Sequence, residues 1–526
     1  MRLARRLHDS FNSDTFAPLY ELRRSRLTSL NARLSALPTE RLEGIRRGIE
    51  KESLRTSQSG KLALTPHPLA LGSALTHPHI TTDFSESQVE LVTDAHTSVQ
   101  DCLDELRQIH QFVYKSIGEE LLWVSSMPCD LPPDADIPIG QYGSSNVGRA
   151  KSVYRMGLAH RYGKRMQTIS GIHYNWSMPG LSNDDYFGLI RNFRRQSFLL
   201  LMLFGASPAV NSGFVAGQAH GLQDLDAHTC YLPYATSLRM GRLGYQSDAQ
   251  SALAVSYNGL KGYAASLQDA LTRAYPAYEA IGIRDEQGNY KQLSTSLLQI
   301  ENEFYSTIRP KRVIQTGERP LHALRERGVE YVEVRCMDLN PFLPVGIDES
   351  TARFLDVFLL HCLLSDSPLD TPQEIAALAR NQQAVASRGR EPGLKLERNG
   401  QQILLIDWAQ EILSACLPIA QRLDDLHGGH AHSQACHSAI AALNEPDTLP
   451  SARVVDALMQ AATGGHAGFT LDRSRQTQAS LMAQPLPEAI NTRLAQQARD
   501  AIKAQNEIEA ADTLPFEDFR IDYMSA

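Results

Sequence analysis

The sequence predicts an α+β protein in which helices cover a sheet and the C-terminal part is rich in helix. Three strand-like segments, residues 48–55, 80–93 and 329–340, each combine an apolar face with a face of ionic side chains. This pattern is typical of a sheet that packs on a core with one face and lines a polar cavity with the other. From about residue 405 onward the chain is rich in Ala and Gln and has few strand signals. We therefore expect a helical layer packed on a mixed core there, rather than an independent domain.

Length and composition describe an ordinary globular protein. The chain has 526 residues, of which 42% are hydrophobic and 21% are charged. Its 59 acidic and 51 basic residues give a net charge of −8, which does not favour nucleic acid or an anionic membrane as a partner. A local basic pocket for a nucleotide is compatible with this balance. The longest apolar run spans residues 198–204, far short of the roughly 18 residues that a membrane helix needs.

Cysteine usage and the N-terminal sequence bear on location. The seven cysteines are widely spaced and no C-x-x-C motif occurs, which is typical of a reduced, cytoplasmic protein and not of a disulfide scaffold. Residues 1–22 carry no apolar signal-peptide core, and we expect a short leader or extension there.

Local patterns predict the remaining elements along the chain. In residues 96–122, apolar side chains recur at helical spacing and define one buried face. Residues 56–79 are rich in Ser, Thr, Gly and Pro, so we expect turns around short strands. The other expected elements are a Pro-rich loop at 126–143, a long helix at 184–204, helices at 350–384 and 406–424 with a Gly- and Arg-rich loop at 387–400 between them, and an acidic segment at 507–519 that docks on the surface.

Several common catalytic motifs are absent from the sequence. It contains no G-x-x-x-x-G-K-[ST], no G-x-G-x-x-G, no G-x-S-x-G and no H-E-x-x-H. A Walker-type ATPase, a Rossmann dehydrogenase, an α/β-hydrolase and a zincin are therefore disfavoured.

The first informative feature is a pair of carboxylates on one strand face. Glu50 and Glu52 are two residues apart, so in a strand their side chains lie on the same side, opposite Ile49 and Lys51. Two such charges a few ångströms apart repel by roughly 1–4 kcal/mol, and a divalent cation removes that repulsion. A solvated strand face is the alternative interpretation of this segment.

Two further segments repeat the pattern. Glu90 lies within an apolar, β-branched run, where a carboxylate is costly unless its face lines a polar site, and Asp83 lies in the loop just upstream. In the third segment, Tyr331, Glu333 and Arg335 share one strand face. Alone, the second segment also fits an edge strand, and the third also fits a structural ion pair.

Together the three segments predict a metal site that faces phosphates. Five carboxylates in one cavity favour Mg²⁺ or Mn²⁺, and Mg²⁺ in turn favours substrate phosphates. Residues 305–312 place Arg309, Lys311 and Arg312 beside a proline turn, where they could meet those phosphates or form a solvated charge cluster. His173 lies on a strand-like run at 167–175. A lone His there is commonly a core or loop residue, but beside five carboxylates it is a candidate sixth ligand.

These segments, with five others in the same order, resemble a known enzyme family. The matching motifs are residues 44–55, 71–76, 80–86, 141–146, 166–175, 231–239, 298–305 and 330–335. Over residues 45–345 the sequence resembles the glutamate–cysteine ligases of the large proteobacterial type. The likeness continues more weakly towards residue 516, and residues 1–22 lie outside it.

The resemblance implies a fold and a reaction. The fold is a curved, mainly antiparallel sheet that forms a funnel, with helices packed outside, akin to glutamine synthetase and the guanidino kinases. The reaction joins the γ-carboxylate of L-glutamate to the amine of L-cysteine with ATP and Mg²⁺, the first step of glutathione biosynthesis. We accordingly expect one catalytic domain over residues 23–526, with the sheet and site mainly in 44–345 and the helix-rich part in 346–526. The likeness also implies a monomer and feedback inhibition by glutathione.

The resemblance assigns roles to individual residues of this chain. The metal ligands implied are Glu50, Glu52, Asp83, Glu90, His173 and Glu333. Arg335 is implied to steady the transferring phosphoryl group. The substrate-binding residues implied are Arg239 for glutamate, Gln167, and Tyr154, Tyr245 and Tyr305 for cysteine. Arg309 and Lys311 are our candidates for the nucleotide phosphates.

The sequence is compatible with two other functions, and one segment departs from the family pattern. The chain could be a ligase of the same fold acting on another amine, or a catalytically silent relative. The histidine-rich tract at 427–437 departs from the family pattern, and we expect a solvated helix start there, with adventitious metal binding as the alternative.

Overall fold

The centre of the molecule is a mainly antiparallel sheet. The computed structural model describes residues 29–244, 248–251, 253–315, 317–460 and 464–525. The strands of the main sheet are β1 (Arg46–Thr56), β2 (Ile80–Thr82), β3 (Gln88–Val92), β4 (Leu121–Leu122), β5 (Ile172–Ser177), β9 (Ile308–Lys311) and β10 (Tyr331–Met337). Within the described residues their order is β2-β3-β1-β5-β10-β9, β4 pairs with β1 off this path, and each neighbour runs antiparallel to the next.

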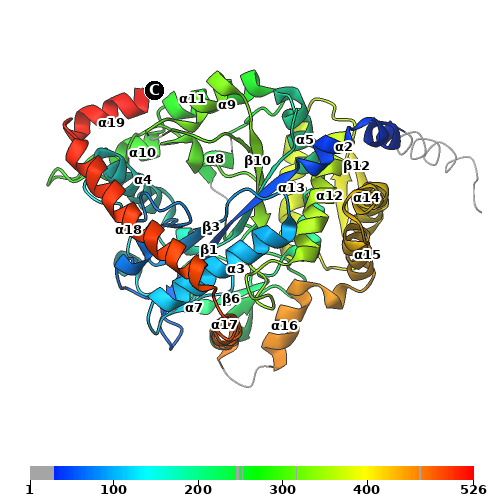
Figure 1. Ribbon diagram of the computed structural model, residues 1–526, viewed down its shortest axis with the longest axis horizontal. Helices are drawn as coiled ribbons and strands as arrows, with labels where there is room; N and C mark the ends of the chain where they lie inside the picture. Colours follow the sequence, from blue (N-terminus) through cyan, green and yellow to red (C-terminus); the bar gives the residue numbers. More distant parts are fainter. Residues whose placement is uncertain (1–28, 245–247, 252, 316, 461–463, 526) are drawn as a thin grey trace, which may run out of the picture.

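One face of the central strand β1 packs on the core. Ile49, Lys51 and Ser53 alternate with the glutamates along β1, and their partners across the sheet include Leu91 and Tyr174. Helices α3 (Val99–Ser116) and α12 (Glu349–Leu364) cover this face. Figure 1 shows β1 crossing the middle of the molecule with α3 beside it. The opposite face of β1 therefore carries Glu50 and Glu52.

Helix α3 forms where the sequence predicts a helix. Its N-terminus is capped by the Ser98 side chain, which accepts a hydrogen bond from the amide of Asp101. Leu106, Ile109 and Val113 recur at helical spacing and are buried against the sheet.

Other helices and two small sheets surround this core. The additional strands are β6 (Ala209–Asn211), β7 (Gln223–Asp226) and β8 (Thr229–Tyr231) in one sheet and β11 (Lys395–Arg398) and β12 (Gln401–Leu404) in another. The additional helices before residue 400 are α2 (Thr39–Glu43), α4 (Asn146–Tyr162), α5 (Asn183–Gln196), α6 (Phe198–Phe204), α7 (Ser212–Val215), α8 (Asp248–Ser251), α9 (Leu260–Thr272), α10 (Pro276–Ile281), α11 (Pro320–Arg327) and α13 (Pro372–Arg388).

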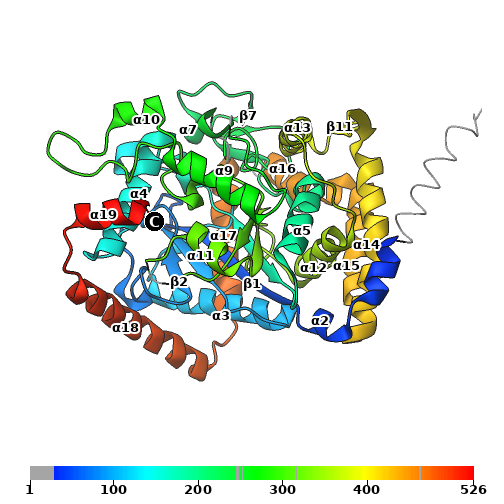
Figure 2. The same ribbon diagram turned by 90° about the horizontal axis from the view of Figure 1, so that it is seen from above.

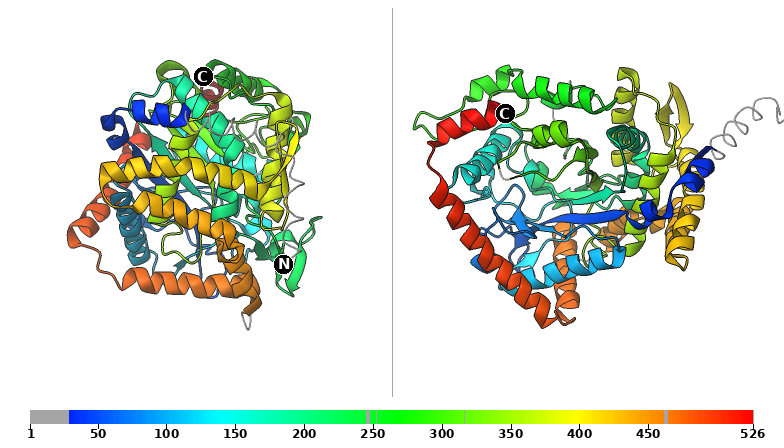
Figure 3. Two further views of the ribbon diagram at one scale, coloured as in Figure 1. Left: turned by 90° about the vertical axis from the view of Figure 1, so that its right-hand side faces the viewer. Right: turned by 45° about the horizontal axis from the view of Figure 1, so that its top comes forward.

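The C-terminal part is helical, as predicted. Its helices are α14 (Leu405–His427), α15 (Ala431–Asn444), α16 (Pro450–Gln460), α17 (Gly465–Met482), α18 (Glu488–Ala511) and α19 (Phe516–Ser525). Helices α14 and α15 form a layer on one side of the molecule, and α18 and α19 lie on the opposite side (Figures 1 and 2). The left panel of Figure 3 shows α14 and α15 from outside. The C-terminal helices therefore lie on two sides of the sheet (Figure 1), and the docking of Phe516 into a buried cluster confirms the predicted surface contact.

Several local predictions are wrong. The long helix expected at 184–204 breaks at Ser197, because α5 keeps a polar face whereas residues 198–203 of α6 are buried on all sides. The loop expected at 387–400 contains strand β11 of the β11–β12 hairpin, and the segment expected to be helical at 350–384 is interrupted at residues 365–371. The described residues 57–79 form turns and one short 3-10 helix at Leu69–Leu71, but contribute no strand to a sheet.

The proline turn expected near residue 310 is also wrong. Pro310 lies inside β9, which is an edge strand of the main sheet. Edge strands tolerate Pro because one side of the strand needs no backbone N–H donor.

The histidine tract is not simply a solvated helix start. His430 is exposed, but His432 is buried and its Nδ1 lies 2.9 Å from Oδ1 of Asp424. The same carboxylate accepts hydrogen bonds from the amides of His432 and Ser433 at 2.8 and 2.9 Å. Asp424 thus satisfies the amides at the start of α15.

No helix among the described residues is both long and apolar enough to cross a membrane. All seven cysteines are buried and unpaired. The leader predicted at residues 1–22 lies outside the described residues.

Candidate active site

Strand pairing brings the predicted metal ligands together on one face of the sheet. Glu52 of β1 lies directly opposite Glu90 of β3, and Glu50 of β1 lies opposite His173 of β5. Glu333 of β10 lies opposite Asn175, two residues beyond His173 on β5. Five side chains from four adjacent strands therefore converge.

Two overlapping groups of ligand atoms result. Glu50, His173 and Glu333 each place one ligand atom within 4.8 Å of the others, and so do Glu52, Glu90 and His173. His173 is shared by both groups: its Nδ1 lies 3.1 Å from Oε2 of Glu50 and its Nε2 lies 3.7 Å from Oε1 of Glu52. Nitrogen and oxygen donors at this spacing can surround a divalent ion.

The protein environment also favours a cation at this face. The buried Nε2 of His173 has no hydrogen-bond partner among the described residues. Burial, and then the charge of Asp83, raise the pKa of Glu52 to about 8. Burial, and then the charges of Glu50, Asp83 and Glu52, also hold the pKa of Glu90 well above its usual range. A divalent ion would supply the missing positive charge, so the residues fit the metal that the sequence predicts.

Asp83 lies beside this set but not within either group. It follows β2, and its backbone carbonyl accepts hydrogen bonds from Arg155 and from the hydroxyl of Tyr142. Its carboxylate is close enough to raise the pKa of Glu52 and Glu90.

Two cations flank Glu333. Arg335 Nη1 lies 2.9 Å from Oε2 of Glu333, and Lys311 Nζ lies 3.0 Å from Oε1. Burial alone would raise the pKa of Glu333, but Lys311 and Arg335 outweigh it and the pKa lies well below its usual range. Glu333 is therefore ionised, and Arg335 and Lys311 place positive charge beside the carboxylate groups.

Arg309 has different surroundings. It lies opposite Glu333 in the β9–β10 register, yet its guanidinium donates to the backbone carbonyls of Asn302 and Phe304. Only 6% of the residue is exposed. Arg309 therefore holds the segment before Tyr305 in this structure.

Three of the predicted substrate-binding residues form one polar and aromatic group. Nε2 of Gln167 donates to the hydroxyl of Tyr305 at 2.9 Å. The pKa of Tyr154 is raised mainly by burial, then by the charge of Glu303, and then by Tyr305, so Tyr154 lies close to Tyr305. Tyr245, the fourth predicted member, lies outside the described residues. The sequence did not single out Tyr162, whose ring packs edge-on against Tyr305 at 5.8 Å.

A cavity of about 340 Å³ adjoins Tyr305. Residues of α5, α6 and α13 line it, together with Gln250, Phe304 and Thr307. Its polar and apolar lining could accommodate a small substrate.

Arg239 is completely buried. Its Nη2 donates to the carbonyl of Arg335 at 2.9 Å, and its Nη1 lies 3.7 Å from Oδ1 of Asp338. A Cβ atom at Gly171 would lie 2.0 Å from Nη2 of Arg239, so only glycine leaves room for the guanidinium there. Arg239 thus lies against β10 and close to Glu52, whose pKa it lowers.

The structure adds two cations that sequence reasoning missed. Arg155 donates through Nη2 to the carbonyl of Thr82, and its guanidinium lies 4.5 Å from the ring centre of Tyr142. Lys151, one turn earlier on α4, lies 5.2 Å from the same ring. The spacing of Lys151, Tyr154 and Arg155 places all three on one helix face, which is the signal that could have found them.

Comparisons with known proteins agree with this arrangement. The family model described as glutamate–cysteine ligase matches residues 32–385. The glutamate–cysteine ligase of Pseudomonas fluorescens is 47% identical over 528 residues, covering 96% of this chain and 99% of that protein. The one from Alcanivorax borkumensis is 46% identical over 516 residues, covering 94% and 98%.

Solved structures show the same fold. Glutamate–cysteine ligase from Francisella tularensis, in complex with AMP, has a TM-score of 0.87 and 38% identity, covering 92% of this chain and 98% of that chain. A bifunctional glutathione synthetase from Pasteurella multocida has a TM-score of 0.66 and 25% identity, covering 87% of this chain and 54% of that chain. The predicted fold, a mainly antiparallel sheet with helices outside and a helix-rich C-terminal part, is confirmed. By sequence, by fold and by the length over which it matches, this chain belongs to the glutamate–cysteine ligase family.

Proposed function

We propose that this chain catalyses its family's reaction at the carboxylate-lined sheet face. The reaction joins the γ-carboxylate of L-glutamate to the amine of L-cysteine, consumes ATP, and yields γ-glutamylcysteine, ADP and phosphate. The observation that carries this proposal is the convergence of Glu50, Glu52, Glu90, His173 and Glu333 on one sheet face. This activity begins glutathione biosynthesis.

The chemistry explains why no protein nucleophile is needed. A carboxylate is a poor electrophile, so the γ-phosphoryl group of ATP is first transferred to glutamate, giving γ-glutamyl phosphate and ADP. The cysteine amine then attacks the acyl carbon, phosphate leaves, and the amine loses a proton. Positioning and neutralisation of negative charge carry such a reaction.

The residues that would hold Mg²⁺ are Glu50, Glu52, Asp83, Glu90, His173 and Glu333, and Mn²⁺ suits the same donors. When bound, the metal would neutralise the phosphate oxygens. Asp83 has the weakest geometric support as a ligand, because the other five residues fall into the two groups of close ligand atoms and Asp83 does not. The orphaned Nε2 of His173 supports its role as a ligand.

Cationic side chains are proposed to meet the phosphates. Arg335 would steady the transferring phosphoryl group, since its guanidinium already lies beside Glu333. Lys311 is the better supported of the two nucleotide-binding candidates, because its ammonium also faces Glu333 whereas Arg309 is engaged with backbone carbonyls. The AMP complex of the Francisella tularensis relative supports a nucleotide co-substrate.

The substrate-binding assignments are proposals of the same kind. Tyr154, Tyr305 and Gln167 would form the cysteine pocket with Tyr245, which the contact between Gln167 and Tyr305 and the adjoining cavity support. Arg239 would bind glutamate; it lies close to Glu52, and in this structure its buried guanidinium donates to the carbonyl of Arg335.

Three broader inferences follow from family membership. Residues 23–526 would form one catalytic domain that acts as a monomer and is inhibited by glutathione. A cytoplasmic location is supported by the seven buried, unpaired cysteines.

The test is ADP release by purified protein with ATP, Mg²⁺ and L-glutamate, with and without L-cysteine. Cysteine-dependent ADP release and a product with the mass of γ-glutamylcysteine are expected. Release that depends on another amine would favour the first alternative, a ligase with a different acceptor. Nucleotide binding without turnover would favour a catalytically silent relative.

A further inference from the structure

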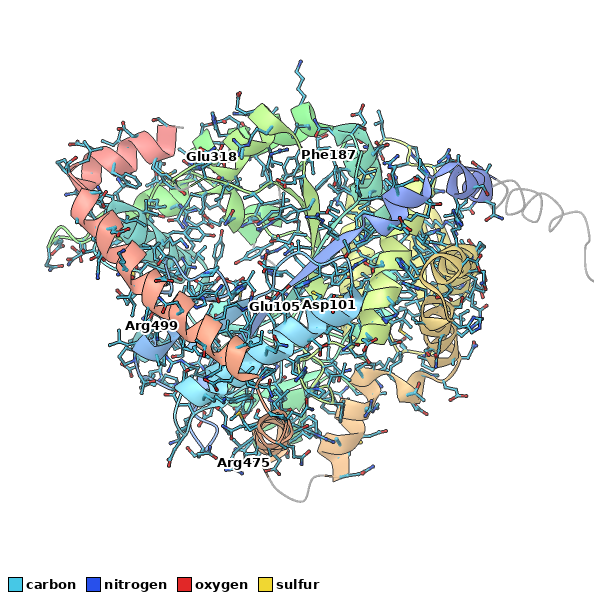
Figure 4. The ribbon with its side chains drawn as sticks, in the orientation of Figure 1. Asp101, Glu105, Phe187, Glu318, Arg475 and Arg499 are labelled. Atoms are coloured by element: carbon cyan, nitrogen blue, oxygen red, sulfur yellow. The ribbon has the colours of Figure 1, made fainter. Side chains whose placement is uncertain are left out.

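A second cluster of metal-binding side chains lies outside the six residues assigned to Mg²⁺. One ring nitrogen of His79 and one carboxylate oxygen from each of Asp94 and Glu105 lie within 4.8 Å of one another. His79 immediately precedes β2, Asp94 follows the end of β3, and Glu105 lies on α3. Figure 4 labels Glu105 on α3, next to helix α18. Three separate segments thus meet at this end of the sheet.

His79 is held as a metal-binding histidine would be. It is 97% buried, with 3% of the residue exposed, and its Nδ1 lies 3.0 Å from the carbonyl of Val92. A ring that donates through Nδ1 keeps its lone pair on Nε2, and such a bond to a carbonyl orients most histidine ligands of metals. Within the described part of the chain, no hydrogen bond reaches Nε2 of His79.

Glu105 is also pre-positioned. It is 6% exposed, and its Oε2 accepts hydrogen bonds from the amide of Asp94 and lies 2.7 Å from Nε2 of His96. These contacts draw the carboxylate towards the end of β3, where the Asp94 side chain is exposed. Arg493 of α18 approaches the other oxygen of Glu105 at 3.8 Å.

We propose that His79, Asp94 and Glu105 bind a divalent transition-metal ion, with Zn²⁺ as the preferred ion. An imidazole nitrogen with two carboxylate oxygens suits Zn²⁺, whereas Mg²⁺ prefers oxygen ligands. His96 holds the Glu105 carboxylate in position from the side. The bound ion would tie the end of β3 to α3.

This site is separate from the proposed catalytic metals. Glu105 lies on α3, which covers the face of β1 opposite the one that carries Glu50 and Glu52. None of the three ligands of this site belongs to the groups around His173.

The test counts Zn²⁺ bound to the full chain by equilibrium dialysis and metal analysis. Glu333→Gln serves as the background, to weaken binding at the catalytic face. His79→Ala and Glu105→Gln are each expected to lose one equivalent of Zn²⁺. The matched control, His228→Ala, removes an exposed histidine in the β7–β8 turn and is expected to lose none. Equal Zn²⁺ content in all these proteins would overturn the proposal.

A second measurement does not depend on the folding of the His79 and Glu105 variants. Crystals of the Glu333→Gln protein soaked in Zn²⁺ should show an anomalous scattering peak between His79 and Glu105. A peak only at the Glu50–His173 face, or none, would overturn the proposal.

Discussion

Glu52 and Glu90 face each other directly across the antiparallel pair β1 and β3. Like charges in this position destabilise a sheet, and here the pKa of both carboxyl groups is raised, chiefly by burial. Without a cation, these groups hold their protons at pH values where an exposed glutamate is ionised. The pair is therefore where metal binding and protonation compete most directly.

This competition predicts that Mg²⁺ stabilises the protein more at pH 8 than at pH 6. The pKa of Glu52 is raised to about 8, while an unfolded glutamate loses its proton near pH 4.5. In the metal-free protein the free energy of unfolding therefore falls as pH rises from 4.5 to 8, because the unfolded chain releases the Glu52 proton more readily than the folded protein does. Bound Mg²⁺ offsets this loss of stability. Melting temperature with and without Mg²⁺ at both pH values measures the effect. An equal shift at both, or an unchanged difference in Glu52→Gln, would contradict the account.

Glu333→Gln should lower turnover by at least about 100-fold while the protein stays folded. The substitution removes a ligand charge and one of the contacts to Lys311 and Arg335. Steady-state ADP release measures the loss, and circular dichroism checks the fold. The matched control is Glu330→Gln, an exposed acid just before β10, which should retain activity. Turnover of Glu333→Gln like that of the unmodified chain would remove Glu333 from the metal site.

Tyr305→Phe should raise the KM for cysteine about 10-fold and change the KM for glutamate less. The substitution deletes the hydroxyl that accepts from Gln167 and borders the cavity. A neutral hydrogen bond of this kind is worth about 1 kcal/mol, or somewhat more when its loss leaves a partner unsatisfied. Tyr290→Phe, which removes a hydroxyl bonded to Glu517 at the C-terminal helix, is the control. Equal changes in both KM values would place Tyr305 outside the cysteine pocket.

The sequence predicted the carboxylate face well because strand periodicity is local. Alternation alone places Glu50 with Glu52 and Glu333 with Arg335, whatever strands lie beside them. The residue pattern also offered His173 as a candidate sixth ligand, and the likeness to a known family then supplied the antiparallel fold and the role of His173 as a metal ligand.

Features that depend on long-range pairing could not be predicted from the sequence pattern. His173 lies between Glu50 and Glu52 only because β5 pairs with β1 in one register, more than 100 residues away in the chain. Arginine is a residue type that commonly binds phosphate, yet in the folded chain the guanidinium of Arg309 donates to two backbone carbonyls. The residues on both sides of Ser197 favour helix, so the local sequence carries no signal for the break there. The break reflects the burial of α6 on all sides.

The core face of β1 carries an unexpected cation. Lys51 is 2% exposed, its Nζ donates to Ser53 at 2.8 Å and lies 2.9 Å from Nε2 of His110, and burial lowers its pKa to about 7. An unfolded lysine titrates near 10.5, so the contribution of Lys51 to stability is fully present above that pH and is lost as pH falls towards 7.

Lys51→Met should therefore flatten the dependence of unfolding free energy on pH between 7 and 10.5. The difference between the two proteins across this window should reach up to about 4 kcal/mol, since each pKa unit is worth about 1.36 kcal/mol. Urea unfolding at several pH values measures it. Lys115→Met, an exposed position on α3, should leave the pH dependence unchanged. Parallel pH profiles for Lys51→Met and the unmodified chain would show that Lys51 keeps an ordinary pKa.

The transfer of an oxygen atom from glutamate to phosphate reports directly on the proposed γ-glutamyl phosphate. If the site phosphorylates glutamate, one oxygen of the γ-carboxylate leaves with the phosphate. Turnover of L-glutamate labelled with heavy oxygen in the γ-carboxylate, with ATP, Mg²⁺ and L-cysteine, should give phosphate that carries one labelled oxygen, detected by mass spectrometry. Phosphate without label, formed together with γ-glutamylcysteine, would contradict a γ-glutamyl phosphate intermediate and the roles assigned to this face.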